Sequence, residues 1–200
     1  MKTNRLPLFA ATAVVLLIMA AGCNTPAKQT GTATADTLVT NPLFKIAPAE
    51  YATLAEQSVL HVAAADFDAW GAMLADDVEY DFPDGDPDTR TKLMGKTAVL
   101  DWWKNYRKTP GVGTMTMTEF NHTPIEVTGN PKGGAKKGIV VLSYFTSTQV
   151  IKGQSVGVRM NFATYFNADK KIDRYTTYYD RTPIVKALGR NMLAEGKATK

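Results

Sequence analysis

Few side chains in this chain of 200 residues could carry out acid–base chemistry, because it contains two histidines and one cysteine. His122 could act as a general base and Asp81 could orient its ring, provided that both face one cavity. Alternatively, His122 is an exposed strand residue beside a bend at Pro124. His61 shares a helical stripe with apolar residues, which favours a place in the core or in the wall of a cavity.

The same counts exclude several classes of protein. One cysteine cannot form an internal disulfide, and two histidines with one cysteine provide no zinc-type ligand cluster. The sequence therefore predicts no metal and no other cofactor. The formal net charge is only +4, and Lys104, Arg107 and Lys108 stand at the end of a predicted helix, where cations complement the helix dipole. We expect no nucleic-acid partner.

Aromatic residues mark the folded part of the chain. All of them except Phe9 lie between Phe44 and Tyr179, so the core must lie there. On a helix the adjacent side chains of Trp102 and Trp103 diverge by about 100°, and one of them should therefore face a pocket or its rim. A pocket with aromatic walls and a few polar groups suits a small, mostly apolar ligand. The residues expected to line it are His61, Trp70, Phe82, Trp103, Tyr106, Tyr144 and Tyr178.

The first 22 residues have the pattern of a secretory signal. Lys2 and Arg5 form a positive start, and an apolar run follows them. The uninterrupted core of that run, Ala13 to Ala21, is too short to span a bilayer comfortably, since a spanning helix takes about 20 residues. An uncleaved membrane anchor is the alternative.

The end of this run, Ala20-Ala21-Gly22-Cys23, resembles the lipobox of bacterial lipoproteins, although Ala20 stands where leucine is commonest. The resemblance implies that Cys23 carries diacylglycerol and a further acyl chain such as palmitate, which would anchor the protein to membrane lipid in the cell envelope. Asn24 stands where an aspartate retains many lipoproteins at the inner membrane. The outer membrane is therefore expected in a cell with two membranes. A plain secreted protein is the alternative.

Composition divides the rest of the chain. Residues 24–40 contain six threonines and no aromatic residue, which is typical of a linker. We predict a lipoprotein signal peptide over residues 1–22, a flexible tether over 23–46, one domain over 47–190 and a polar tail over 191–200.

Periodicity within the domain predicts helices first and strands later. Apolar residues at helical spacing follow Pro48, and Asp66 is a suitable N-cap for a second helix. The later β-branched and aromatic runs predict strands. Three helices followed by long antiparallel strands indicate an α+β fold. The expected helices are 49–65, 66–74, 95–107 and 182–188, the expected strands are 76–82, 114–127, 139–151, 156–166 and 172–180, and the expected loops are 83–87 and 131–138.

Several short motifs follow one another along the domain. They are Asp66-Phe67-Asp68-Ala69-Trp70, Leu74-Ala75-Asp76-Asp77-Val78, Gly95-Lys96-Thr97-Ala98-Val99, Asn167-Ala168-Asp169-Lys170-Lys171-Ile172 and Tyr179-Asp180-Arg181. Their order resembles the nuclear transport factor 2-like superfamily, in particular its SnoaL-like branch, over residues 47–190. The resemblance implies a cone, in which three N-terminal helices pack on a strongly curved, mostly antiparallel sheet. Enzymes, binding modules and association domains share this fold, so the fold alone assigns no function.

The ketosteroid isomerases form one enzymatic branch of the superfamily, and this chain lacks their catalytic residues. Alignment on that branch puts Phe82 at the position of the base carboxylate and Ser58 at that of the tyrosine. Asn161 or Phe162 falls at the position of the acid. Asp81 is one residue away from the base position, but a shift of one residue points a strand side chain to the other face.

Two further branches give weaker matches. Arg159-Met160-Asn161 resembles the Arg-x-Asp element of the limonene epoxide hydrolases, but Asn161 is not a carboxylic acid. The SnoaL-like polyketide cyclases imply an acidic residue near the end of the last strand, and Asp180 is the suitable position. Alternatively, Asp180 caps a helix or pairs with Arg181.

Taken together, the residues and the resemblance predict a tethered domain that binds a small, mostly apolar ligand without strong catalysis. One alternative is a cyclase, isomerase or hydrolase that uses Asp81, His122 or Asp180. A second alternative is an association module that forms a homodimer through the sheet. Large residues on both faces of strand 139–151, such as Tyr144 and Phe145, would favour that packing.

Overall fold

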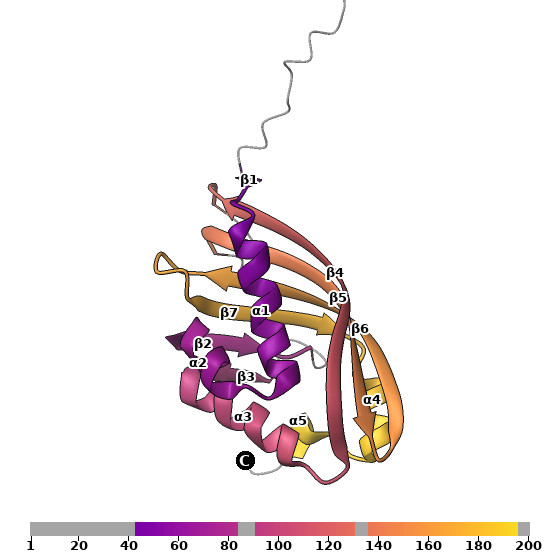
Figure 1. Ribbon diagram of the computed structural model, residues 1–200. Coiled ribbons are helices and arrows are strands. Elements are labelled where there is room, and N and C mark those ends of the chain that lie inside the picture. The colour runs from indigo at the N-terminus through magenta and orange to yellow at the C-terminus, as the bar shows by residue number, and fades with distance from the viewer. Residues whose placement is uncertain (1–42, 84–90, 131–135, 196–200) are drawn as a thin grey trace, which may run out of the picture. The chain divides into compact units, whose positions relative to one another are not determined.

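The computed structural model describes residues 43–83, 91–130 and 136–195. The chain passes twice from helices to strands before it ends in two short helices (Figure 1). In chain order the elements are β1 (Phe44–Ile46), α1 (Glu50–Ala64), α2 (Phe67–Met73), β2 (Leu74–Asp81), β3 (Lys92–Met94), α3 (Lys96–Lys108), β4 (Val112–Val127), β5 (Gly138–Ile151), β6 (Gln154–Phe166), β7 (Ile172–Tyr179), α4 (Thr182–Leu188) and α5 (Met192–Glu195).

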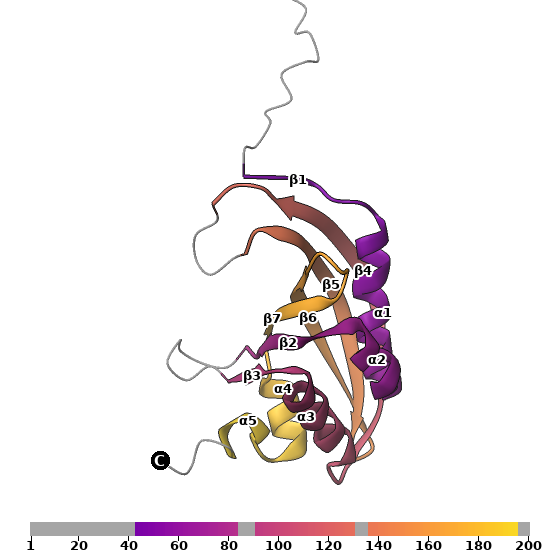
Figure 2. The same ribbon diagram turned by 90° about the vertical axis from the view of Figure 1, so that its left-hand side faces the viewer.

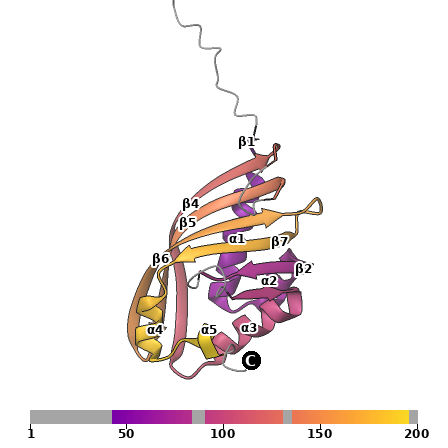
Figure 3. The same cartoon turned by 180° about the vertical axis from the view of Figure 1, so that it is seen from behind.

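The strands of the described residues form one sheet in the order β1-β4-β5-β6-β7-β2-β3. β2 and β7 run parallel, and every other neighbouring pair is antiparallel. The long strands bend strongly along their length (Figure 2). α1 crosses the strands in the view of Figure 1 and lies behind them in the reverse view, so it covers one face of the sheet (Figure 3). The predicted α+β fold with a curved, mostly antiparallel sheet is confirmed.

A tight corner separates α1 from α2. Ala65 adopts a left-handed conformation with φ 59°, and its N–H donates to the carbonyl of Val62. The side chain of Asp66 then accepts a hydrogen bond from the N–H of Ala69 at 3.1 Å. This bond satisfies one of the free N–H groups at the start of α2. The predicted N-cap role of Asp66 is confirmed.

A bulge bends β4. The pairing of β4 with β5 shifts just after Thr118, and Glu119 has a positive φ of 57°. A bulge inserts one extra residue, so it reverses the alternation of faces beyond it. In a regular strand, Met117 and His122 would point to opposite faces, because an odd number of residues separates them. The bulge brings both side chains to the inner, helix-covered face of the sheet.

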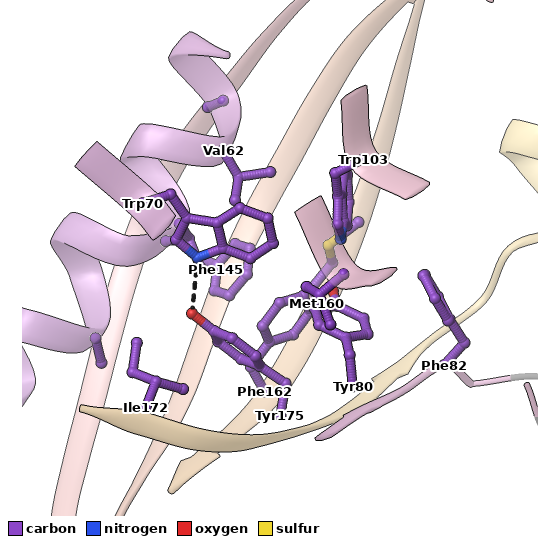
Figure 4. Packing of buried hydrophobic residues seen from close by; sticks show 14 of the residues in the cluster. Val62, Trp70, Tyr80, Phe82, Trp103, Phe145, Met160, Phe162, Ile172 and Tyr175 are labelled. Atoms are coloured by element: carbon purple, nitrogen blue, oxygen red, sulfur yellow. Dashed lines mark hydrogen bonds between the residues drawn. The ribbon is translucent and has the colours of Figure 1, made fainter. Parts of the chain in front are cut away.

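An aromatic cluster fills the space between the helices and the sheet (Figure 4). Trp70 of α2 donates from its indole nitrogen to the hydroxyl of Tyr175 on β7 at 3.0 Å, and both side chains are buried. Tyr80 of β2 packs on Tyr175 with ring centroids 5.1 Å apart and on Trp103 of α3 at 6.0 Å. Because aromatic side chains bury large areas, this cluster dominates the packing energy of the core.

Three short elements are absent from the sequence prediction. β1 lies within the residues predicted as tether and pairs with the end of β4, while β3 pairs with β2. α5 lies within the predicted polar tail and carries the buried Leu193 into the core. Elements of three or four residues show no detectable period, which is why sequence patterns miss them.

Several predictions concern residues outside the described ranges. These are the signal peptide, Cys23 and most of the tether, nearly all of the loop 83–87 and most of the loop 131–138. Among the helices that the structure describes, none has the length and apolarity needed to cross a bilayer.

Candidate functional site

A small cavity lies inside the aromatic cluster. Its volume is about 20 Å³, which is room for one water-sized group. The wall consists of apolar, aromatic and neutral polar side chains, and no Asp, Glu, His, Lys or Arg side chain belongs to this lining among the described residues. The lining residues are Val59, Val62, Trp70, Tyr80, Trp103, Met115, Met117, Ser147, Gln149, Met160, Phe162, Tyr175 and Tyr179.

Three polar atoms of this wall are buried without a hydrogen-bond partner in the described part of the chain. They are the Tyr80 hydroxyl, the Trp103 indole nitrogen and the Ser147 hydroxyl, and their residues are 1%, 7% and 0% exposed. An unpaired buried polar group costs about 1–3 kcal/mol. The indole N–H can only donate, whereas a hydroxyl can donate or accept. A group that accepts hydrogen bonds would therefore satisfy this wall.

Burial keeps the tyrosines of the wall protonated. It raises the pKa of Tyr80 well above 10, the neighbouring Tyr179 and Tyr175 add to this rise, and the indole N–H of Trp103 opposes it. That indole faces the Tyr80 hydroxyl without meeting the geometry of a hydrogen bond. Burial also raises the pKa of Tyr175 to about 12. At neutral pH these phenols are hydrogen-bond donors and not bases.

A second cavity, of about 40 Å³, lies beneath α4 and α5. Trp103, Gln149, Met160 and Tyr179 line both cavities, so their side chains form the partition between them. The hydroxyl of Tyr106 donates to the side-chain oxygen of Gln149 in this partition. The second cavity differs from the first because its lining includes charged residues, Arg181 and Arg190.

The structure places four of the predicted pocket residues in cavity walls. Trp70 lines the first cavity, Phe82 and Tyr106 line the second, and Trp103 lines both. Trp102, the neighbour of Trp103, lines only the second and stacks on Tyr106 with the ring planes 6° apart.

The other predicted pocket residues lie elsewhere. Tyr144 and Tyr178 are 50% and 55% exposed, because each stands beside an inward residue on its strand and alternation turns it to the outer face. Tyr144 and Tyr178 both neighbour Asn161 of β6 in the sheet register. His61 lies at the end of α1, where its Nδ1 is 3.5 Å from a carboxylate oxygen of Asp66.

Asp81 and Phe82 show the effect of strand alternation directly. Phe82 is buried and lines the second cavity, whereas Asp81 turns outward, 3.4 Å from the ammonium of Lys92, and accepts from the Thr176 hydroxyl at 3.4 Å. The inward side chain at the isomerase base position is thus a phenylalanine. Asp81 does not belong to the lining of either cavity.

The structure does not bring His122 and Asp81 together, since three strands separate β4 from β2 in the sheet. His122 instead lies between α1 and the sheet. Its Nε2 is 3.1 Å from a carboxylate oxygen of Glu56 on α1, and its Nδ1 is 2.9 Å from the hydroxyl of Ser143 on β5. A carboxylate only accepts, so in the neutral ring Nε2–H donates to Glu56 and the Ser143 hydroxyl donates to Nδ1.

This Glu56–His122–Ser143 chain has the bonding order of a catalytic triad, but its surroundings are those of a structural contact. Ser143 is buried, and it does not belong to the lining of either cavity. Phe120 covers the other side of the imidazole, with ring centroids 5.5 Å apart. The chain of bonds therefore fastens α1 to the sheet.

The remaining candidate acidic and basic groups face solvent. The side chain of Thr182 and then its N–H, which donates to the Asp180 carboxylate at 2.8 Å, lower the pKa of Asp180. Arg159 is exposed and lies 3.7 Å from Glu119. In the described ranges, no three side chains of the His, Cys, Asp or Glu type gather where they could hold a metal ion.

Comparison with known proteins bears on the fold. No protein-family model matches the sequence, and no curated protein matches it either. Among solved structures, a proposed polyketide cyclase from Xanthomonas campestris aligns with a TM-score of 0.51 and 17% identity over 69% of this chain and 96% of its own. A proposed isomerase from Bacillus subtilis aligns with a TM-score of 0.53 and 18% identity over 72% and 96%. A proposed polyketide cyclase from Pseudomonas putida aligns with a TM-score of 0.51 and 18% identity over 68% and 96%.

The chain has the nuclear transport factor 2-like fold. The alignments span nearly the whole length of these proteins, so the likeness covers the entire cone and not one motif. At 17–18% identity it carries the fold and no activity. The predicted fold is confirmed at this level.

Sequence reasoning missed several residues of the cavity walls. Tyr80, Ser147, Gln149 and Tyr175 are all on strands, and alternation against their outward neighbours is the signal that could have found them. The methionines of the wall belong to the same group. Met115 and Met117 alternate with threonines, a pattern that marks an inward face.

Loss of the hydroxyl should change the stability of the protein differently at the two buried tyrosines Tyr175 and Tyr80 of the first cavity. Tyr175→Phe leaves the indole N–H of Trp70 buried without its acceptor, so we expect the free energy of unfolding to fall by about 1–3 kcal/mol. Tyr80→Phe removes a hydroxyl that has no partner, so it should leave stability unchanged or raise it. Urea unfolding of both variants is the measurement, and equal losses would contradict the assigned bonding.

Proposed function

We propose that the cone binds a small, mostly apolar ligand that carries a hydrogen-bond acceptor, and that it does so without strong catalysis. The observation that carries the proposal is the group of three unpartnered donors, Tyr80, Trp103 and Ser147, around an otherwise apolar cavity. Apolar walls with a few directed polar groups are characteristic of small-molecule sites.

The two cavities together would provide the volume for a ligand and its path into the cone. Both are small, so a ligand larger than a water molecule requires the partition of Trp103, Gln149, Met160 and Tyr179 to move. Met160 has an unbranched, flexible side chain that adapts to irregular shapes. Its displacement would join the two cavities into one site that reaches the space beneath α4 and α5.

The proposal of weak or absent catalysis rests on the protonation states of the lining. Among the described residues, no carboxylate or imidazole lines the first cavity, and burial keeps Tyr80 protonated. General acid–base catalysis needs a group whose pKa lies near the operating pH. A cyclase, isomerase or hydrolase of the kinds considered above would have to bring Asp81, His122 or Asp180 to the ligand from places where each already has other partners.

Two probes of matched shape test the ligand class. We expect the purified mature chain to bind cyclohexanone about tenfold more tightly than methylenecyclohexane, since the ketone oxygen accepts hydrogen bonds and a lost bond to a buried donor is worth roughly that factor. Tyr80→Phe and Ser147→Ala should each reduce the preference. Tryptophan fluorescence titration is the measurement.

Tyr51→Phe is the matched control, because Tyr51 is buried against Phe166 and lies outside the lining of either cavity. It should leave the preference intact. Equal affinity for the two probes, or binding of neither, would contradict the proposed ligand class.

We also propose that the domain is held at a membrane of the cell envelope through acylated Cys23, at the outer membrane where the cell has two. The support is sequence alone: the signal-like residues 1–22, the lipobox-like segment that ends at Cys23, and the linker composition that follows. More than one acyl chain provides stable anchoring.

Mass spectrometry of the N-terminal peptide from the native membrane fraction tests the anchor. We expect the peptide to begin at Cys23 and to carry the added mass of diacylglycerol and an acyl chain. A Cys23→Ser variant should lose the modification and remain unprocessed. An unmodified Cys23, or a chain that still begins at Met1, would refute the anchor.

A second candidate function, association through the outer face of the sheet, is favoured by one observation. Tyr144 and Tyr178 stand half exposed on either side of Asn161, next to the apolar Leu142 and Ala163. Sedimentation of the mature chain should then show a dimer at micromolar concentration that Tyr144→Ser with Tyr178→Ser dissociates. A monomer at all concentrations would exclude this function.

A further inference from the structure

The first described residues of the chain expose an apolar cluster. Leu43 is 47% exposed, Phe44 45% and Ile46 87%. They stand within four residues of one another, at the point where the predicted tether joins the domain. Large apolar side chains that gather at one exposed place mark an interaction surface more often than scattered ones do.

The sheet register extends this cluster. Phe44 lies opposite Val127 and Ile46 opposite Ile125 on the neighbouring strand β4, and side chains that face each other across antiparallel strands share one face. Lys45 alternates with them, so it points to the other face, where it pairs with Glu126 at 3.2 Å. One corner of the sheet thus presents Phe44 and Ile46 on one face beside Val127 and Ile125, and the exposed Leu43 directly precedes them in the chain.

We propose that this corner is a membrane-docking surface, at which Leu43, Phe44 and Ile46 enter the interface of the bilayer that anchors the chain. The inference rests on the proposed attachment through Cys23. Leucine and phenylalanine are residues with which peripheral proteins enter the boundary between headgroups and acyl chains.

Chain length favours the bilayer as the occupant. The segment 24–42 has 19 residues between Cys23 and the cluster, so the two can be at most about 65 Å apart. Tethering at such a distance gives millimolar effective concentrations, so contacts that are weak on their own become populated. No part of the domain is closer to the anchor along the chain than these residues.

Other occupants fit less well. Residues 24–40 are rich in threonine and lack aromatic residues, so they offer little apolar surface to cover the cluster. A second copy would find a paired length of only three residues on β1. The outward tyrosines Tyr144 and Tyr178 lie further along the sheet, because Tyr144 faces Asn121 and Ile46 faces Ile125. Tyr144 shares the face of Ile46, but its partner on β4 is four residues away from the partner of Ile46.

Chemical attachment tests docking without relying on natural acylation. The chain from Cys23 onward contains one thiol, which couples to a maleimide lipid in phosphatidylcholine vesicles. We expect hydrogen exchange in the peptide 43–47 to slow at least fivefold on coupling, compared with the uncoupled chain beside the same vesicles. Mass spectrometry of the exchanged peptides is the measurement.

Leu43→Ser with Phe44→Ser and Ile46→Ser should abolish the slowing. These side chains are exposed, so the fold should survive, which near-ultraviolet circular dichroism checks. Tyr144→Ser with Tyr178→Ser is the matched control with similar exposure, and it should retain the slowing.

Unchanged exchange on coupling would overturn the proposal, as would slowing that survives the triple variant. Slowing that appears only when many chains share a vesicle would assign the corner to a second copy. Failure of natural acylation would show separately in the mass of the native N-terminal peptide. The coupled experiment still decides docking in that case.

Discussion

The hydrogen bond from the Trp70 indole to the Tyr175 hydroxyl joins the helical layer to the sheet at the centre of the core. Both groups are buried, so neither can exchange its partner for water. Trp70 reaches Tyr175 because the corner at Ala65 and the cap at Asp66 set the direction of α2. Tyr175 in turn supports Tyr80, and through Tyr80 the rest of the aromatic cluster.

The bulge at Glu119 is the second constraint on this architecture, because it decides which side chains of β4 face inward. Without the extra residue, a strand with Met117 inward would turn His122 outward. With it, His122 reaches Glu56 of α1 and Ser143 of β5. One backbone irregularity thus bends the strand around the cluster and converts a surface histidine into a fastening between α1 and the sheet.

The sequence could predict most elements of the fold and only part of the candidate site, for one physical reason. Long segments carry a period of 3.6 or 2, so α1, α3, β5 and β6 follow from the pattern of apolar residues. The cavity depends on which strands lie side by side, and neighbours such as β7 and β2 are distant in the sequence. Tyr80 and Tyr175 meet across that parallel pair, and no local pattern reports it.

The sequence identifies candidate site residues by type more readily than it identifies the residues that they contact. Trp70 and Trp103 were expected in a cavity wall and lie there. Tyr144 and Tyr178 were grouped with them by type, although the alternation of their own strands turns them outward. The sequence suggests Asp81 as the partner of His122, because a carboxylate can orient an imidazole base. Glu56, its actual partner, lies on a helix whose placement over β4 is set by tertiary packing.

Ion pairs on the outer face of the sheet contrast with the neutral lining of the first cavity. On the outer face, Glu79 lies 2.9 Å from Arg174 and 3.3 Å from Lys92. Partial burial raises the pKa of Glu79, but these cations outweigh it and hold the pKa below its usual value. The described lining of the first cavity has no charged side chain, and an unpaired charge there would be strongly unfavourable.

Neutral donors avoid that penalty. Tyr80, Trp103 and Ser147 place neutral hydrogen-bonding groups in the wall of the first cavity without placing a charge in the low-dielectric interior. Burial also raises the pKa of Tyr80, so its phenol stays protonated at neutral pH. A wall with neutral donors and no charged side chain in its described lining supports the proposal of a binding site.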